Sequence, residues 1–157
     1  MKLRVLSVPL IFFGLLRLSV PAYSATCTIA NADVAFGTYD PLSGQPRDTN
    51  GSVRVTCTGS PGEKINYVLM LVSPGGKRTI SNASNRQSVL EFNLYLDIAR
   101  TQVWGDGTNG TSVISDSLVL DGSSTTPTYT IYGRISGGQK RASAGAYQEN
   151  FAISLAY

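Results

Sequence analysis

The sequence contains no histidine and only two cysteines, Cys27 and Cys57. The absence of histidine excludes the catalytic triads and acid–base pairs that depend on an imidazole. Two cysteines alone do not complete the four-ligand site of structural zinc. We therefore expect a protein that is not an enzyme and that uses no metal, cofactor or small-molecule substrate.

Four aspartates, Asp97, Asp106, Asp116 and Asp121, were considered as paired carboxylates for glycoside cleavage. Each lies in or beside a predicted turn, where aspartate commonly accepts hydrogen bonds from the backbone. The structural interpretation of these residues is therefore favoured. The Gly105–Gly110 turn also lacks the ligand spacing and the distal glutamate of a calcium loop.

Long apolar runs are absent except at the N-terminus, where residues 1–24 have the features of a secretory signal peptide. A basic start is followed by an apolar run over residues 5–16, which is shorter than the roughly 20 residues that a membrane-spanning helix needs. Small residues at Ala22 and Ser24 predict cleavage after Ser24, with cleavage after Ala25 as the alternative. We expect an exported protein whose mature domain spans residues 25–157 and does not span the membrane.

Charge is also sparse, since Lys, Arg, Asp and Glu make up 15% of the chain. Three of the 13 basic residues lie in the signal peptide, and all 10 acidic residues lie after it, so the mature chain has no formal net charge. A nucleic-acid partner is not indicated, because phosphate binding needs clustered excess Lys and Arg. The pairs Lys77-Arg78 and Lys140-Arg141 are interpreted as solvated turn charges.

The two cysteines are expected to pair, because exported proteins mature in an oxidising compartment. The pair would close a loop of roughly 30 residues and stabilise the fold by about 3 to 4 kcal/mol in the chain-entropy model. In this interpretation the pair is structural, not catalytic.

No segment shows a sustained helical period, and extended segments alternate with glycine-rich turns. The clearest alternation is at residues 90–97, where four apolar residues fall on one side of a strand. Residues 65–72 are apolar on both faces and predict a strand covered on both sides or near the sheet centre, whereas residues 43–51 are polar and predict a loop. About seven short strands in a domain of this size predict an antiparallel β-sandwich.

The last predicted strand has Phe151, Ile153, Leu155 and Tyr157 on one face and runs to the final residue. No alternating apolar segment stands between the predicted cleavage site and Cys27. A sandwich that lacks an edge strand exposes apolar side chains and unpaired backbone groups. We therefore expect another chain to cover this edge.

Seven motifs occur in order over essentially the whole mature chain, and together they resemble the spore coat protein U domain. This family includes the subunits of archaic chaperone-usher pili of Gram-negative bacteria. The motifs are Cys27-Thr-Ile, Val34-Ala-Phe-Gly-Thr-Tyr-Asp-Pro41, Gly51-Ser-Val-Arg-Val-Thr-Cys57, Phe92-Asn-Leu-Tyr-Leu-Asp-Ile-Ala-Arg100, Val103-Trp-Gly-Asp-Gly-Thr108, Ile131-Tyr-Gly-Arg-Ile135 and Gly145-Ala-Tyr-Gln-Glu-Asn-Phe-Ala-Ile-Ser-Leu-Ala-Tyr157.

The resemblance implies an incomplete immunoglobulin-like sandwich that a strand from another chain completes. The implied partners are a periplasmic chaperone, an outer-membrane usher and other pilus subunits, and the implied destination is a surface fibre that supports adhesion or biofilm formation. Phe151, Ile153, Leu155 and Tyr157 would border the groove and contact the chaperone. Because the expected mature chain has no N-terminal donor segment, we expect a terminal or minor subunit.

An alternative hypothesis is a tip adhesin or a secreted coat module that binds a surface or glycan without polymerising. Its candidate contacts are Trp104, the only tryptophan, and Asp106 in the following turn. An exposed aromatic side chain beside polar loops can stack on a sugar, but packing of Trp104 over the core is the favoured interpretation.

Overall fold

The strands follow the two-residue alternation of the sequence. The computed structural model describes residues 24–72 and 78–157. Among these residues, no helix is long and apolar enough to cross a membrane. The strands are β1 (Thr26–Asp33), β2 (Arg47–Thr58), β3 (Lys64–Val72), β4 (Arg78–Asn82), β5 (Val89–Tyr95), β6 (Ile114–Val119), β7 (Thr128–Ile135), β8 (Tyr147–Gln148) and β9 (Ala152–Ala156).

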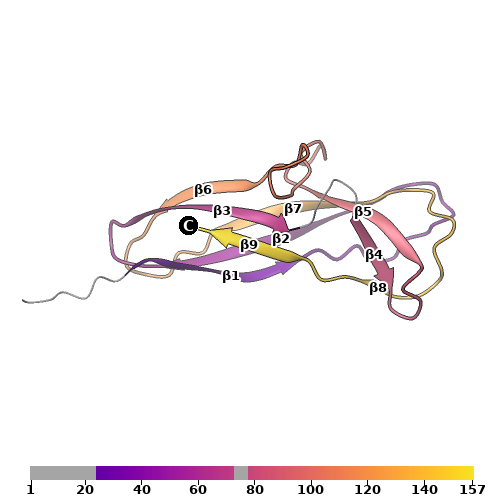
Figure 1. Cartoon of the computed structure of the whole chain (residues 1–157), viewed down its shortest axis with the longest axis horizontal. Helices are drawn as coiled ribbons and strands as arrows, with labels where there is room; N and C mark the ends of the chain where they lie inside the picture. Colours follow the sequence, from indigo (N-terminus) through magenta and orange to yellow (C-terminus); the bar gives the residue numbers. More distant parts are fainter. Residues whose placement is uncertain (1–23, 73–77) are drawn as a thin grey trace, which may run out of the picture.

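Two antiparallel sheets form an elongated sandwich (Figure 1). The larger sheet has the strand order β1-β2-β7-β5-β4-β8, and the smaller sheet has the order β6-β3-β9. The predicted all-β antiparallel sandwich is confirmed, with nine strands in the described part of the chain instead of about seven.

The strands β4 and β8 were not predicted, because neither carries an apolar alternation. The inward positions of β4 are Arg78, Ile80 and Asn82, so two of the three buried side chains are polar. The strand β8 is only two residues long. Both strands form through pairing with distant segments, β4 with β5 and β8 with β4, and local sequence does not reveal such pairing.

The core lies between the two sheets and is formed by alternate residues of the longer strands. In β2, Val53, Val55 and Cys57 alternate with more exposed residues, point inward and are almost fully buried. The inward faces of β3, β5 and β7 complete it with Ile65, Tyr67, Leu69, Leu71, Leu90, Phe92, Leu94, Ile131 and Ile135. Removing this apolar area from water is the main favourable contribution to folding.

Of two predictions about individual segments, one is confirmed and one is wrong in part. The strand β3 is central in its sheet, which is one of the two predicted alternatives, and only one of its faces is fully covered, with Val72 53% exposed. Residues 43–51 are not all loop, because β2 begins at Arg47 and pairs with β7 from that residue onward. The first residues of β2 resemble a loop in sequence, because their outward side chains are exposed to solvent. Their inward positions are Thr49 and Gly51, so no apolar alternation marks this part of the strand.

The predicted disulfide is confirmed. Cys27 and Cys57 are directly opposite each other on β1 and β2, and their sulfur atoms are 2.00 Å apart. Both side chains are buried at the end of the sandwich where the described chain begins. The bond joins the first strand to the strand beside it.

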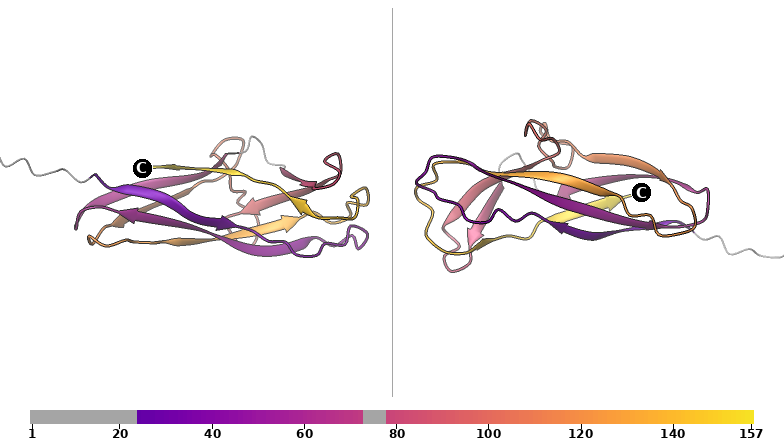
Figure 2. Two further views of the ribbon diagram at one scale, coloured as in Figure 1. Left: turned by 90° about the horizontal axis from the view of Figure 1, so that it is seen from below. Right: turned by 180° about the vertical axis from the view of Figure 1, so that it is seen from behind.

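The C-terminal segment moves from one sheet to the other. β8 pairs with β4 in the larger sheet, and after three residues β9 pairs with β3 in the smaller sheet. The end of β9 lies near β1, the outermost strand of the larger sheet (Figure 2). One edge of the sandwich is therefore bounded by the first and last strands.

We predict that the double substitution Cys27→Ala/Cys57→Ala lowers the free energy of unfolding by about 3 to 4 kcal/mol, because it removes a cross-link between residues 30 apart. Urea denaturation of the purified protein measures the change. Reduced wild-type protein should behave like the double variant. Equal midpoints for the oxidised wild type and the variant would contradict the prediction.

Candidate functional site

An apolar groove of about 1140 Å³ lies between two segments that are far apart in sequence. We call residues 32–42, which complete and follow β1, the N-terminal wall. Residues 140–153, which lead into β9, form the C-terminal wall. The floor of the groove comes from both sheets and consists of Val53, Leu71, Ile80, Leu90, Phe92, Leu94, Trp104 and Ile135.

The N-terminal wall is attached to the larger sheet by side chains that bind its backbone. Arg47 Nε donates to the Phe36 carbonyl at 2.9 Å, and Thr49 Oγ1 donates to the Ala35 carbonyl at 2.7 Å. Tyr39 Oη donates to the Ser136 carbonyl at 2.8 Å. These bonds hold the wall beside β2 and β7 beyond the end of β1.

Packing of Phe36 against Gly133 adds a further attachment. Gly133 is buried in β7, and a β-carbon built there would lie 2.9 Å from the Phe36 ring and 3.0 Å from Val34. The missing side chain of Gly133 therefore leaves the space that the N-terminal wall occupies. Glycine in a strand often marks such a close approach.

The C-terminal wall is held by the connection between β4 and β5. Tyr147 Oη donates to the Ser143 carbonyl and lies 2.7 Å from Ser88 Oγ. Ser88 Oγ in turn accepts a hydrogen bond from the Ser143 N–H. The buried Asn82 donates from Nδ2 to the Ala144 carbonyl at 3.3 Å. The groove is thus open between two walls that are each fixed to the larger sheet.

Three phenyl rings cross the groove from wall to wall. Phe92 on the floor lies 5.6 Å from Phe36 of the N-terminal wall and 5.3 Å from Phe151 of the C-terminal wall, measured between ring centroids. Edge and tilted contacts at these distances are favourable for aromatic pairs. The row makes the middle of the groove strongly apolar.

The strands beside the groove also have unused backbone edges. β9 pairs with β3, and no strand in the part of the chain that the structure describes pairs with its other edge. β1 is the end strand of the larger sheet and pairs with β2. An apolar groove that meets the ends of such strands offers side-chain pockets and backbone hydrogen-bonding groups close together, which is what an extended peptide needs.

The four predicted groove residues divide into two pairs. Phe151 and Ile153 line the groove. Leu155, which is opposite Leu69 on β3, is partly buried against the core outside the groove lining, and Tyr157 is 59% exposed beyond the end of β9. Chaperone contact by these four residues remains a prediction.

Trp104 is only 1% exposed, in agreement with the favoured interpretation that it packs over the core, so its side chain does not form a surface contact. Its indole Nε1 donates to the Leu69 carbonyl at 3.3 Å, and its ring lies in the groove floor. Asp106 accepts hydrogen bonds from the N–H and hydroxyl of Thr108 at 2.9 and 2.7 Å. These bonds lower the pKa of Asp106 below its ordinary value and stabilise its own turn.

Arg78 is a structural residue that the sequence interpretation missed. It is not a solvated charge, because it is 2% exposed and donates to the Trp104 carbonyl at 2.5 Å and to Asn93 Oδ1. Burial lowers the pKa of Arg78. Its neighbour Lys77 lies outside the described residues, and no signal in the sequence separates a buried arginine from a solvated one at this position.

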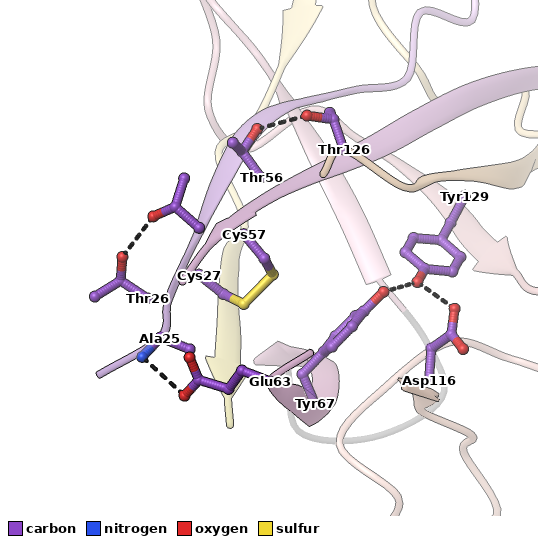
Figure 3. Close-up of a disulfide and its surroundings, with 11 residues drawn as sticks. Ala25, Thr26, Cys27, Thr56, Cys57, Glu63, Tyr67, Asp116, Thr126 and Tyr129 are labelled. Atoms are coloured by element: carbon purple, nitrogen blue, oxygen red, sulfur yellow. Dashed lines mark hydrogen bonds between the residues drawn. A yellow bond between two sulfur atoms is a disulfide. The ribbon is translucent and has the colours of Figure 1, made fainter. Parts of the chain in front are cut away.

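The hydroxyl groups of Tyr67 and Tyr129 contact each other across the sandwich (Figure 3), and Tyr129 also donates to Asp116 Oδ2 at 2.7 Å. Burial raises the pKa of Tyr129, and its hydrogen bond lowers the pKa of Asp116. A tyrosine with a raised pKa stays protonated and can donate its hydroxyl proton to Asp116. The contact therefore joins β3, β6 and β7 through hydrogen bonds between these three side chains.

We predict that Gly133→Ala destabilises the protein by about 1 to 3 kcal/mol, because its new methyl group overlaps the Phe36 ring. Adding Phe36→Ala should cost less in this background than in the wild type, since the overlap is already relieved. Urea denaturation measures both effects, with Thr130→Ala on the exposed face of β7 as the control. Additive costs would contradict the proposed packing.

The chain was compared with curated proteins and with solved structures. A search of curated proteins by sequence finds no match. Among solved structures, a chain from a chaperone–tip adhesin complex of CFA/I fimbriae biogenesis matches with 10% identity and a TM-score of 0.43. The match covers 87% of this chain and 53% of that chain, so the present chain spans about half of its length.

A family model also matches most of the chain. The Spore Coat Protein U domain matches residues 13–154, which include all of β1 to β8 and most of β9. The matched region begins inside the predicted signal peptide, and the cleavage position remains a prediction. The chain belongs to the Spore Coat Protein U domain family.

Proposed function

We propose that this chain is a structural subunit of a chaperone-usher surface fibre and that its groove accepts an extended strand from another protein. The observation that carries this proposal is the position of the groove, which lies between two fixed walls and reaches Ile153 near the start of β9, a strand whose other edge has no partner among the described residues. Apolar side chains and backbone hydrogen-bonding groups are therefore available next to each other.

A free edge of this kind is hazardous for an exported protein. Exposed apolar area and unpaired backbone groups promote association with any available strand. A strand inserted beside β9 would satisfy the backbone groups, and its alternate side chains would enter the apolar groove. Occupation of the groove would therefore both stabilise the fold and link this chain to its partner.

The partners follow from the family resemblance. A periplasmic chaperone would supply the strand after export, and an outer-membrane usher would exchange it for a strand of another pilus subunit. The protein would then pass from the periplasm into a fibre at the cell surface and support adhesion or biofilm formation there. None of these steps requires catalysis by the chain itself.

A terminal or minor position in the fibre is part of the proposal. It depends on the predicted cleavage after Ser24, which leaves two residues before Cys27. The alternative of a glycan-binding tip loses its main candidate contact, because Trp104 is buried in the groove floor.

We predict that Ile153→Asp abolishes complex formation with the periplasmic chaperone of its own pilus system and lowers periplasmic yield. The substitution places a charge in the groove, where burial of an unpaired carboxylate is costly. Co-expression with a tagged chaperone followed by co-purification measures the complex.

The matched control is Ala152→Asp, because Ala152 lies next to Ile153 on β9 but is exposed and outside the groove lining. This variant should retain the complex. Equal loss of the complex in both variants would argue against recognition through the groove. A wild-type chain that is a stable monomer without any chaperone would overturn the proposed function.

A further inference from the structure

The backbone nitrogen of Ala25 lies 3.2 Å from Glu63 Oε1, at the same end of the sandwich as the disulfide (Figure 3). In the uncleaved chain this nitrogen belongs to the peptide bond between Ser24 and Ala25 and donates its N–H to the carboxylate. Ala25 is also the residue at which the mature chain is predicted to begin. A carboxylate therefore stands beside the nitrogen that cleavage would release.

Both sides of this contact are held in place by the fold. The other carboxylate oxygen of Glu63 accepts the Ser60 N–H at 3.0 Å, and the Glu63 carbonyl accepts the Leu120 N–H at 2.8 Å. Ala25 is 9% exposed. Its β-carbon packs closely on Gly59, because a β-carbon built at Gly59 would lie only 3.0 Å from it. Ala25 and Glu63 thus face each other before any cleavage takes place.

We infer that Glu63 is the binding site for the N-terminal ammonium of the mature chain. Hydrolysis of the Ser24–Ala25 bond by a signal peptidase adds water, leaves the carboxylate on Ser24 and gives Ala25 a free amine that takes up a proton. The neutral N–H donor then becomes a charged one beside a carboxylate. Charge-assisted hydrogen bonds of this kind are about twice as strong as neutral ones.

The position of the nitrogen makes this inference specific to one cleavage site. Cleavage after Ala25 would remove both the nitrogen and the buried methyl group. Cleavage further upstream would leave a neutral amide at Ala25, as in the precursor. Of the two cleavage sites predicted from the sequence, only cleavage after Ser24 places the new ammonium charge beside the Glu63 carboxylate.

The consequence for assembly rests on the proposed function. An N-terminus bound to Glu63, two residues before the disulfide-bonded Cys27, leaves no free segment that could enter the groove of a neighbouring subunit. Such a chain accepts a strand and does not donate one. The ammonium site would therefore set the place of this subunit in the fibre.

The test uses the full chain exported with its own signal peptide. N-terminal sequencing and intact mass should show a mature end at Ala25. The purified protein is then treated at pH 7 with a limiting amount of an acetylating reagent, and mass spectrometry follows modification of the N-terminal amine. Wild-type protein should react several-fold more slowly than Glu63→Gln, because each unit by which the carboxylate raises the pKa of the amine lowers the reactive fraction about tenfold.

Glu63→Gln keeps an oxygen acceptor for the Ser60 N–H, and Glu91→Gln on the exposed face of β5 is the control that should react like wild type. Equal rates for wild type and Glu63→Gln would overturn the inference. A mature end at Thr26, or one upstream that retains Leu18 and Val20, would overturn it as well.

If Glu63→Gln does not accumulate, the pH dependence of labelling in the wild type decides. An amine pKa above the ordinary range of about 7.7 to 8.0 supports the contact, and a value within that range overturns it. Chaperone binding is measured separately, so failure of the ammonium site and failure of the groove proposal give different results.

Discussion

The chain covers one edge of its sandwich only in part, and the rest of the structure depends on how this edge is arranged. The first and last strands bound this edge, and they belong to different sheets. Between them the floor side chains of both sheets reach an apolar groove instead of a neighbouring strand. Backbone groups beside an apolar surface must find partners or remain in water, and this constraint makes the edge the place where another chain can associate.

The groove stays open because its walls are attached to the larger sheet by specific contacts. Side chains of β2 bind the backbone of the N-terminal wall, and Phe36 packs on Gly133. The C-terminal wall is tied to the turn between β4 and β5 through Asn82 and Tyr147. A wall held by side-chain bonds does not need to pair with the opposite wall, and the space between them remains available.

The opposite end of the sandwich is closed. There the disulfide joins β1 to β2, and Glu63 receives the nitrogen of Ala25. An open groove and a closed start of the chain fit the proposed subunit that receives a strand. The proposed terminal position and the proposed ammonium site at Glu63 both depend on cleavage after Ser24, so the mature N-terminus decides them together.

Much of the fold could be predicted where one residue pattern determines the outcome. The inward faces of β2, β5 and β7 follow from apolar alternation, and Cys27 and Cys57 are the only residues able to form a disulfide. The prediction was wrong for Arg78, which occupies an inward position of β4 and donates to the distant Trp104 carbonyl. Asn82 holds another inward position of the same strand and donates to the Ala144 carbonyl. The favoured packing of Trp104 over the core agrees with its burial, but its place in the groove floor depends on packing between the sheets.

The sequence by itself determined the longer strands, the class of fold and the family, because alternation and motif order are properties of the linear chain. It also predicted that Phe151, Ile153, Leu155 and Tyr157 would border an uncovered edge, and of these Phe151 and Ile153 line the groove. Only the tertiary structure decided that the groove has two walls, that Phe36 fills the space above Gly133, and that Glu63 lies beside Ala25. Each of these contacts joins residues far apart in the chain, and their proximity arises only when the two sheets pack.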